Sequence, residues 1–410
     1  MTRTTPDSCP GVLRLHQAAD GPLARVRVPG GVLSPDQLRT LAEAATELGD
    51  GAIELTSRGN AQLRQVRDAG ALTERLESAG LLPSRTHERV RNILASPLSG
   101  RVGGLTDVRS LPPALDAALR ADPRLAELPG RVLFTADDGR GDVSALSPDI
   151  GVQATADEYA LLLAGADTGI RLAPGDAVDV MLAAAHSFLD VSSGQWRLHE
   201  VPDGVARVVD LLGLSPTGER LGLAAAEHPI GWLTQDDGGV ALSAGVPLGS
   251  LPARTAEFLA AVERPVILTP WRGVVLPDLD EWTAEQVVRV LAPMGLIFDA
   301  ESPWLRVTAC AGLPGCAKSH TDVRGDVAAA VAAGRVTPTG AGPATTGTVV
   351  PAEEVTVAGR QHWSGCDRRC GRPRGAVVEV IAGPGGYRVE GPAAANPEIP
   401  GSGPRTPVNR

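Results

Sequence analysis

The sequence predicts an α+β fold that contains an internal duplication. A strand–helix–strand pattern over residues 23–63 returns over residues 240–276. The blocks after the two copies, residues 85–223 and 300–391, each mix strand-like and helix-like segments. A strand, a helix and a strand in so few residues make half of a ferredoxin-like unit. Its recurrence therefore indicates two related half-domains.

The first copy contains every signal that such a unit requires. Residues 23–28 alternate in a strand-like way and end at a Pro-Gly-Gly turn. Ser34 is a suitable N-cap for the following helix, and Gln37 completes a capping box. Gly49 ends this helix, and residues 52–56 are expected to form the second strand.

The second copy repeats these elements in the same order. Residues 240–245 match the first strand and its glycine, residues 251–262 match the helix, and residues 266–276 match the second strand. The spacing from glycine to threonine is also similar. It is 25 residues from Gly31 to Thr56 and 24 residues from Gly245 to Thr269.

Composition sets the class of protein. The 410 residues suffice for two or more domains, and 43% hydrophobic with 21% charged residues is ordinary for a globular chain. A net charge of −10 gives no support for binding to nucleic acid or to a membrane surface. No stretch approaches the ~18 apolar residues of a membrane span, and residues 1–20 lack an apolar signal core. We therefore expect a cytoplasmic protein with neither nucleic-acid nor membrane partners.

Four of the five cysteines fall in two pairs, Cys310-x5-Cys316 and Cys366-x3-Cys370. Four thiolates suit an iron–sulfur cluster or a structural zinc ion. Zinc sites use spacings of two to four residues, so the first pair argues against zinc. The alternative is unrelated buried cysteines or two disulfides, which are rare in the cytosol. We predict that the four cysteines bind one [4Fe–4S] cluster.

Two further groups of polar residues are candidates for ligand binding. Thr56, Arg58, Asn60 and Gln62 follow the second strand, and arginine binds carboxylates through paired, charge-assisted hydrogen bonds. The alternative for Arg58 is a solvated charge at a strand end. Near the cysteine pairs lies a basic patch, in which some members are expected to be plain surface charges: Lys318, Arg368, Arg369, Arg372 and Arg374.

These motifs resemble those of the siroheme-dependent sulfite and nitrite reductases. In that superfamily C-x5-C and C-x3-C motifs hold a [4Fe–4S] cluster, and the last cysteine also bridges it to the tetrapyrrole iron. Residues 310–316 and 362–373, together with the Cys9-Pro-Gly opening, look most like the precorrin-3B synthase branch. The resemblance covers about residues 7–391.

The resemblance implies a complete architecture. Duplicated ferredoxin-like half-domains are joined by two larger α/β catalytic subdomains around a pseudo-two-fold axis. It divides the chain into half-domains at 1–78 and 226–299, catalytic subdomains at 79–225 and 300–391, and a disordered tail at 392–410. Residues 335–348 are expected to form a loop.

The resemblance also implies an activity. Precorrin-3B synthases use dioxygen to hydroxylate precorrin-3A and close a γ-lactone in aerobic cobalamin biosynthesis, so we expect a monooxygenase. No Gly-x-Gly-x-x-Gly motif follows a predicted strand, so a separate reductase or ferredoxin is expected to deliver electrons to a monomeric enzyme. The alternatives are a sulfite or nitrite reductase with bound siroheme, and a non-enzymatic electron carrier or sensor.

Site residues are transferred from the same resemblance. The Thr56–Gln62 segment resembles the T-x-R-x-N-x-Q motif that contacts the macrocycle. Arg91-Asn92 matches a second basic position, and Arg131 stands where relatives have lysine, but Leu133 replaces the second lysine of sulfite reductases. The predicted catalytic residues are Arg58, Arg91 and Arg131, and the predicted substrate-binding residues are Thr56, Arg58, Asn60, Gln62, Asn92, Lys318 and Arg369.

The synthase branch is also associated with a mononuclear non-haem iron, which needs histidines and a carboxylate. His320 and Asp322, in H-x-D spacing, and His362 are the candidates. The interpretation that we favour is that the histidines cap or orient the cluster loops. Siroheme is expected only under the reductase alternative.

Overall fold

The structure is a computed structural model that describes Asp7 and residues 9–223, 226, 228–338, 349–373 and 375–391. The expected tail at 392–410 and most of the expected loop at 335–348 lie outside these residues. The chain divides into two compact units, Met1–Ser302 and Pro303–Arg410, each of which is described by itself. Among the described residues, every helix is too short or too polar to span a bilayer.

The first half-domain forms from the predicted elements. They are β1 (His16–Ala18), β2 (Gly21–Val26), the 3-10 turn η1 (Pro29–Gly31), β3 (Val32–Leu33), α1 (Pro35–Leu48), β4 (Ala52–Leu55), β5 (Ala61–Leu63) and α2 (Ala69–Ser78). The capping box of α1 is confirmed. Gln37 N donates to Ser34 Oγ at 3.2 Å, and Ser34 N donates to Gln37 Oε1 at 3.1 Å.

The second half-domain repeats this order element by element. It consists of β11 (Gly231–Thr234), β12 (Val240–Gly245), η6 (Pro247–Gly249), β13 (Ser250–Pro252), α6 (Ala253–Ala260), β14 (Val266–Leu268), β15 (Gly273–Leu279) and α7 (Glu281–Leu291). One predicted match is wrong, because the counterpart of Gly31 is Gly249 rather than Gly245. Each of these two glycines ends a 3-10 turn with a positive φ, 73° and 72°. The similar spacing was a coincidence, since α6 has 8 residues where α1 has 14.

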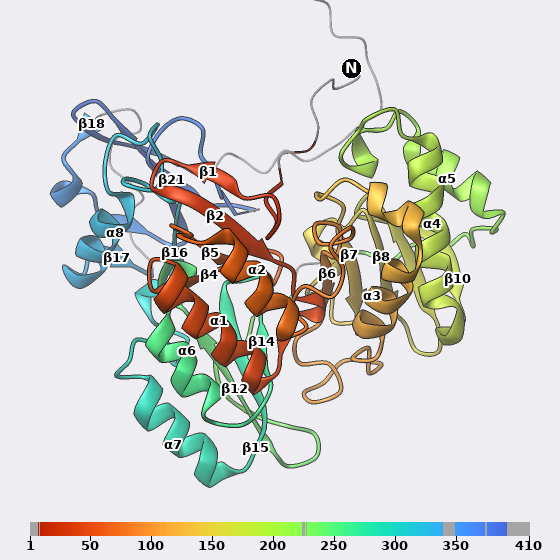
Figure 1. Cartoon of the computed structure of the whole chain (residues 1–410), viewed down its shortest axis with the longest axis horizontal. Helices are drawn as coiled ribbons and strands as arrows, with labels where there is room; N and C mark the ends of the chain where they lie inside the picture. The colour runs from red at the N-terminus through yellow and green to blue at the C-terminus, as the bar shows by residue number, and fades with distance from the viewer. Residues whose placement is uncertain are drawn as a thin grey trace, which may run out of the picture. The chain divides into compact units, whose positions relative to one another are not determined.

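Each half-domain lends one short strand to the sheet of the other. The first sheet has the order β1-β2-β5-β4-β13 and the second β11-β12-β15-β14-β3. Leu251 pairs with Ile53 in the first sheet, and Leu33 pairs with Val266 in the second. Helices α1 and α6 pack side by side (Figure 1). This exchange gives the duplicated ferredoxin-like α+β fold, as the sequence predicted.

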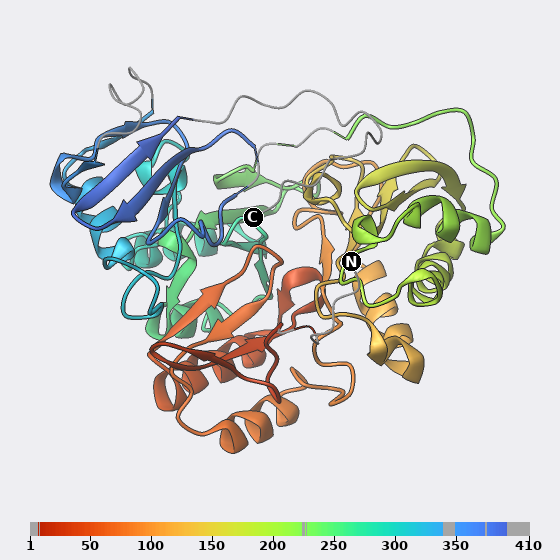
Figure 2. The ribbon, with the colours of Figure 1, turned by 90° about the horizontal axis from the view of Figure 1, so that it is seen from above.

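The first α/β block follows the first half-domain and belongs to the same unit. Its sheet has the order β10-β9-β8-β7-β6, in which the ladders β6–β7 and β7–β8 are parallel and β8–β9 and β9–β10 antiparallel. Helix α3 packs against β6, and α4 packs against β8 (Figure 2). The bounds are β6 (Ile93–Ala95), α3 (Leu111–Ala121), β7 (Phe134–Asp137), β8 (Ile150–Ala154), β9 (Tyr159–Leu163), β10 (Ala166–Leu172), α4 (Ala177–Val191) and α5 (Gly204–Leu212).

The second unit contains a sheet with the same ladder pattern. In the order β16-β20-β21-β22-β18, the first two ladders are parallel and the last two antiparallel. Part of the expected loop is instead strand β17, which pairs with β19. The bounds are β16 (Val307–Ala309), α8 (Val323–Ala332), β17 (Val336–Thr337), β18 (Val349–Val350), β19 (Val357–Ala358), β20 (Gln361–Ser364), β21 (Val378–Gly383) and β22 (Gly386–Glu390).

Candidate functional site

The cysteine pairs follow two neighbouring parallel strands of the second unit. Cys310 comes directly after β16, and Cys366 comes two residues after β20. The two loops are joined by hydrogen bonds. Gly365 N lies 3.2 Å from Cys310 Sγ, and His320 N donates to Gly365 O at 2.9 Å. Because both parallel strands end at the same edge of the sheet, the two predicted pairs meet there.

The four thiols lie close enough to influence one another. Burial, followed by the neighbouring Cys310 and Cys366, raises the pKa of the Cys370 thiol, and Cys316 contributes in the same direction. All five cysteines of the chain lie in the described part, and none forms a disulfide. Four free thiols on two joined loops are soft donors of the kind that an iron–sulfur core binds. The residues therefore fit the predicted cluster.

Buried His362 connects the cysteine loops to the sheet. Its Nε2 lies 3.2 Å from the carbonyl oxygen of Cys370, and its Nδ1 lies 2.9 Å from Thr308 Oγ1. A carbonyl only accepts, so Nε2 carries a proton in this arrangement. Asp322 caps α8 by accepting from Gly325 N at 3.1 Å, and His320 is exposed. These contacts favour a role in orienting the loops over a role as ligands of a second iron.

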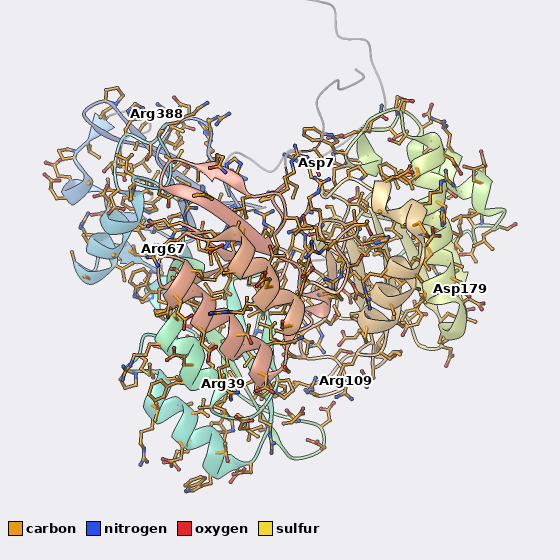
Figure 3. The ribbon with its side chains drawn as sticks, in the orientation of Figure 1. Asp7, Arg39, Arg67, Arg109, Asp179 and Arg388 are labelled. Atoms are coloured by element: carbon orange, nitrogen blue, oxygen red, sulfur yellow. The ribbon has the colours of Figure 1, made fainter. Side chains whose placement is uncertain are left out.

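Two members of the basic patch near the cysteines, Arg369 and Arg372, are paired with acids. Arg369, a predicted substrate contact, lies 3.0 Å from Glu379 Oε2 and 2.8 Å from Glu390 Oε2. Arg388, labelled in Figure 3, pairs with Glu390 and with Asp367. Lys318 is exposed, and Arg374 lies outside the described residues. Within this unit, exposure leaves Lys318 the more accessible of the two predicted substrate contacts.

In the first unit, Arg58 lies in a tight turn that Thr56 closes. Thr56 Oγ1 accepts from the backbone N of Arg58 at 3.3 Å and of Asn60 at 3.1 Å. The second copy builds the same turn, since Thr269 Oγ1 accepts from Gly273 N at 3.0 Å. Thr56 therefore serves the backbone. The Arg58 side chain is half-buried, and burial together with the nearby Arg197 charge lowers its pKa to about 10.

Two further arginines, which the sequence analysis did not select, lie near Arg58. Arg27 Nη2 is 3.3 Å and Arg25 Nη1 is 3.5 Å from the sulfur of Cys9. Arg27 is 2% exposed, and its Nη1 has no hydrogen-bond partner among the described residues. Burial, with the nearby charges of Arg25 and Arg58, lowers the pKa of Arg27 to about 10, although Cys9 acts in the opposite direction. We call Arg25, Arg27 and Arg58 the arginine cluster.

In the described part of the chain, the guanidiniums of the arginine cluster are not engaged in ion pairs. Among the ion pairs of the described residues, none involves its three members. Gln62, a predicted substrate contact, instead accepts from Arg25 Nε at 2.8 Å. The signal that could have revealed Arg25 and Arg27 is their i, i+2 spacing in a strand, which puts them on one face.

Two predicted substrate contacts, Asn60 and Asn92, are buried and bonded to each other. Asn60 Nδ2 donates to Asn92 Oδ1 at 3.1 Å, and Asn60 Oδ1 accepts from Val28 N at 2.9 Å. Asn92 Nδ2 donates to the carbonyl oxygen of Gly130 at 2.9 Å. Their amides are therefore engaged in joining the half-domain to β6.

The other two predicted catalytic arginines have different surroundings. Arg91 is 4% exposed and donates both Nε and Nη2 to Asp116 on α3. Arg131 is half exposed, its guanidinium lies 4.6 Å from the ring centre of Trp196, and its Nε lies 3.7 Å from Asp7 Oδ1 (Asp7 is labelled in Figure 3). Arg91 thus has an acid partner, whereas Arg131 is accessible.

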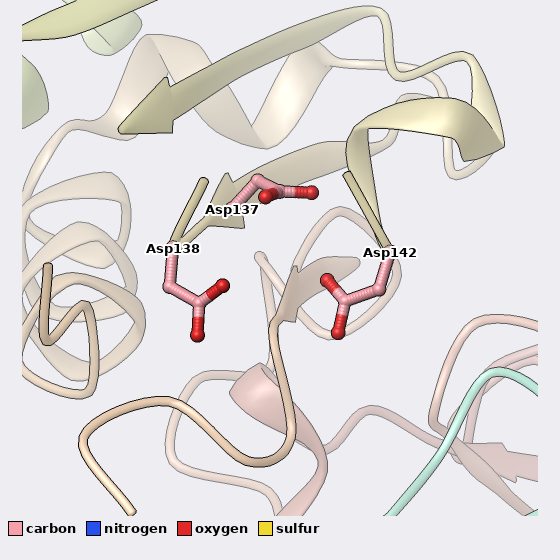
Figure 4. A group of neighbouring side chains, drawn as sticks. All are labelled: Asp137, Asp138 and Asp142. Atoms are coloured by element: carbon pink, nitrogen blue, oxygen red, sulfur yellow. The ribbon is translucent and has the colours of Figure 1, made fainter. Parts of the chain in front are cut away.

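An acidic group at the end of β7 also escaped the sequence analysis. Among the described residues, only Asp137, Asp138 and Asp142 bring three possible ligand atoms within 4.8 Å of one another (Figure 4). Each carboxylate has protein partners. Asp137 accepts from four backbone N–H groups at 2.9–3.0 Å, Asp138 pairs with Arg140, and Asp142 accepts from Ser96 Oγ at 2.6 Å. Burial and the Asp137 charge raise the pKa of Asp142 to about 7.

Known proteins match the chain over different lengths. Residues 16–79 match the nitrite/sulfite reductase ferredoxin-like half domain. A precorrin-3B synthase from Sinorhizobium sp is 25% identical over 406 residues, which cover 95% of this chain and 83% of that protein. A sulfite reductase [ferredoxin] 1 from Mycolicibacterium paratuberculosis is 28% identical, covering 74% of this chain and 61% of that protein. A ferredoxin–nitrite reductase from Synechococcus elongatus is 30% identical, covering 42% of this chain and 36% of that protein.

A solved structure has the same fold. The Mycobacterium tuberculosis NirA protein aligns with a TM-score of 0.72 at 19% sequence identity, over 90% of this chain and 73% of that chain. The half-domain match, the exchange of strands between two such half-domains and the nearly full-length similarity agree with one another. Together they show that the chain is similar in sequence to a precorrin-3B synthase along nearly its whole length, contains a nitrite/sulfite reductase ferredoxin-like half domain, and shares its fold with the NirA protein.

Proposed function

We propose that the chain is an oxidoreductase that converts precorrin-3A into precorrin-3B, using dioxygen to hydroxylate the macrocycle and close a lactone. The observation that carries this proposal is the similarity to a precorrin-3B synthase along nearly the whole of both chains. The reductases above match over at most 61% of their length. Leu133, in place of a lysine typical of sulfite reductases, also favours a large organic substrate over a small anion.

The arginine cluster supports a substrate rich in carboxylates. Its three guanidiniums have no acid partner among the described ion pairs, and guanidinium matches carboxylate through two parallel hydrogen bonds. The pKa values of Arg27 and Arg58, about 10, keep both charged near neutral pH. We infer that Arg25, Arg27 and Arg58 bind the acetate and propionate arms of the tetrapyrrole. Gln62 orients Arg25, and Thr56, Asn60 and Asn92 hold the backbone around them.

Arg131 and Lys318 remain candidates for direct contact, because both are accessible. Arg91 and Arg369 fit better as positioning residues, since acids already pair with their guanidiniums. We also propose that the enzyme is cytoplasmic and monomeric.

Cys310, Cys316, Cys366 and Cys370 would hold a [4Fe–4S] cluster. When bound, the cluster supplies one-electron transfer from an external reductase or ferredoxin. The chain's own contribution is to fix the ligands. Gly365 N–H lies within hydrogen-bonding distance of the Cys310 sulfur, and His362 anchors the Cys370 carbonyl. A mononuclear non-haem iron belongs to the same proposal, without assigned ligands.

An absorption spectrum and one assay test this function. We expect anaerobically purified protein to show cluster absorption without siroheme. Given dioxygen and a reductant, it should convert precorrin-3A into a product with one added oxygen atom. A siroheme chromophore together with sulfite or nitrite reduction would establish the alternative reductase. Cluster-loaded protein that leaves precorrin-3A unchanged would favour an electron carrier.

Substitution of Arg58 tests the substrate site. Loss of one charge-assisted pair costs roughly 1.5–3 kcal/mol, so Arg58→Ala should raise the dissociation constant for precorrin-3A about ten- to a hundredfold. The cluster spectrum should not change, because Arg58 lies in the other unit. The matched control is Arg39→Ala, which removes an exposed arginine paired with Asp36 and Glu263. Equal affinities of the two variants would exclude Arg58 from the site.

A further inference from the structure

Cys9 occupies the middle of the positive charge of the arginine cluster. Its sulfur lies within hydrogen-bonding distance of Arg25 and Arg27. The side chain is 9% exposed, so it borders solvent without lying open to it. No other cysteine of the chain lies in this unit. The sequence assigns Cys9 no part in the cluster.

The arginines beside Cys9 donate to neutral oxygens: Arg27 to the carbonyl oxygens of Arg89 and Pro10, and Arg25 to Gln62 Oε1. The Asp7 carboxylate accepts from Cys9 N at 3.0 Å and forms no ion pair with Arg25 or Arg27 among the described residues. Sulfur is a weak hydrogen-bond acceptor, and Arg27 Nη1, in a side chain that is 2% exposed, has no partner among the described residues. Buried guanidiniums without acid partners are costly unless an anion joins them. An oxyanion would therefore stabilise the site, and the Cys9 sulfur lies within 3.5 Å of one donor from each of Arg25 and Arg27.

We propose that Cys9 is an oxidation site at which conversion to a sulfinate closes the arginine cluster to carboxylate ligands. The oxidant is hydrogen peroxide. In the first step an S–O bond forms, the peroxide O–O bond breaks, and the thiol becomes a sulfenic acid with release of one water. A second peroxide repeats this exchange, gives the sulfinic acid and one water, and the acid loses its proton to solvent. Sulfur gives up two electrons in each step, and the peroxide accepts them.

The Cys9 sulfinate would supply the anionic acceptor that the arginine cluster lacks. A sulfinate offers two charged oxygens to the N–H donors of Arg25 and Arg27, which now share one sulfur. It thereby takes the donors that a ligand carboxylate would use and cancels part of the attracting charge. The inference rests on the carboxylate ligand of the proposed function and does not depend on the conversion of that ligand.

The experiment follows the oxidation state of Cys9 and ligand binding together. Cluster-loaded full-length protein is treated with small increments of hydrogen peroxide under nitrogen. Mass spectrometry measures oxidation of the Cys9 peptide, and titration measures the affinity for uroporphyrin, a polycarboxylate tetrapyrrole probe. Cys9→Ser protein, treated in parallel, reports any effect of peroxide on the metal cluster or elsewhere.

We expect the affinity of the wild-type protein for uroporphyrin to fall about tenfold or more in step with sulfinate formation. Cys9→Ser should keep its own starting affinity, and prior saturation with uroporphyrin should protect Cys9. Cys9→Asp, which places a permanent carboxylate there, should bind weakly without peroxide. If that variant fails to fold, the peroxide series still decides.

Three results would overturn the inference. In the first, peroxide abolishes uroporphyrin binding while Cys9 stays a thiol. In the second, the sulfinate forms and the affinity for uroporphyrin does not fall. In the third, peroxide lowers the affinity of Cys9→Ser as much as that of the wild type. Untreated protein that binds no uroporphyrin would reject the arginine cluster as a carboxylate site, and this inference with it. Failure of precorrin-3A turnover alone, with uroporphyrin binding intact, would reject only the proposed reaction.

Discussion

Two arginines that the sequence analysis grouped together, Arg58 and Arg91, differ in whether an acid pairs with the guanidinium. We infer that the paired arginine stabilises the fold and that the unpaired one binds the ligand. Arg91 shares a buried ion pair with Asp116, whereas Arg58 has no acid partner among the described ion pairs. Without Arg91, Asp116 keeps Arg120 Nε at 3.0 Å as a partner but loses its two buried charge-assisted hydrogen bonds, which costs roughly 1.5–3 kcal/mol. Arg91→Ala should therefore lower the free energy of unfolding by that amount, measured by denaturant titration.

Arg58→Ala provides the comparison, since it removes a desolvated cation and leaves no acid behind. Its free energy of unfolding should equal or exceed that of the wild type. If Arg91→Ala keeps wild-type stability but loses affinity for precorrin-3A, Arg91 contacts the substrate and its structural assignment is wrong.

Asp142 should make stability depend on pH. Its pKa is about 7 in the folded chain against an ordinary value of 3.8 for aspartate, so the folded state binds the extra proton between these values. Stability from this group is fully present below about pH 4 and is lost as pH rises through about 7. Asp142→Asn should therefore gain roughly 2–4 kcal/mol over wild type between pH 4 and 8. The measurement is denaturant unfolding across that range.

The control for this pH dependence is Asp179→Asn, which changes an exposed carboxylate on α4. Its stability difference from wild type should stay constant with pH. Parallel profiles for Asp142→Asn and the wild type would mean that folding does not raise the pKa of Asp142.

At the scale of elements, the two 3-10 turns that lead into the exchanged strands are equivalent but unequally crowded. Gly31 and Gly249 both have positive φ, and a Cβ at Gly31 would lie 2.2 Å from the carbonyl oxygen of Leu268. A Cβ at Gly249 would lie 2.8 Å from Cδ and 2.9 Å from Cβ of Arg272, a contact that is less close than the one at Gly31. Gly249→Ala should cost about 1–2 kcal/mol for its backbone conformation, and Gly31→Ala roughly 3 kcal/mol or more.

Thermal and denaturant unfolding of the two alanine variants measure this difference. Because the conformational term is common to both, the excess cost at Gly31 isolates the clash with Leu268. Equal losses would show that the backbone at the β3–β14 junction yields to an added methyl group.

The sequence analysis succeeded where signals are local. The capping box at Ser34 and the strand–helix–strand order depend on residues near one another in the chain. The exchange of β3 and β13 escaped it, because strands of two and three residues have no readable alternation. The match of Gly245 with Gly31 was also wrong. Helix α6 is shorter than α1, and this difference hid the fact that the chosen glycine lies four residues too early in the second copy.

The same contrast applies to the candidate site. The cysteine pairs stand out from sequence because few residue types ligate iron and their spacing is short. Arg25 and Arg27 did not stand out, because alternating charges in a strand usually indicate a solvated face. Asn60 and Asn92 looked like ligand contacts, but partners far along the chain, Val28 and Gly130, occupy their amides.

At the scale of the whole molecule, the two α/β blocks share one ladder pattern but close their loops differently. In the first block, the loop after β7 is held by the Asp137 carboxylate, which accepts four backbone N–H groups. In the second block, the corresponding loop after β20 contains Cys366 and Cys370. The first block thus carries its own anchor within the chain, whereas the second presents the cysteines that we propose as ligands of the cluster.

This difference predicts which part of the chain loses stability when the cluster is absent. A serine hydroxyl is a poor substitute for thiolate, so Cys316→Ser should lack iron and acid-labile sulfide. Metal binding contributes folding energy to the segment that supplies the ligands. Amide hydrogen exchange should therefore rise across residues 303–391, while β6 to β10 keep wild-type protection.

Asp137→Ala should reverse this pattern, because it removes the internal anchor and leaves the cysteines intact. Exchange should then rise in the first α/β block, with the cluster spectrum retained. Hydrogen exchange read by mass spectrometry compares both variants with the wild type in one experiment. A Cys316→Ser protein that is fully loaded with its cluster would refute the ligand assignment. If Cys316→Ser exchanges faster in both units, the two blocks are not stabilised independently. The cluster would then also stabilise the first unit, which contains none of its proposed ligands.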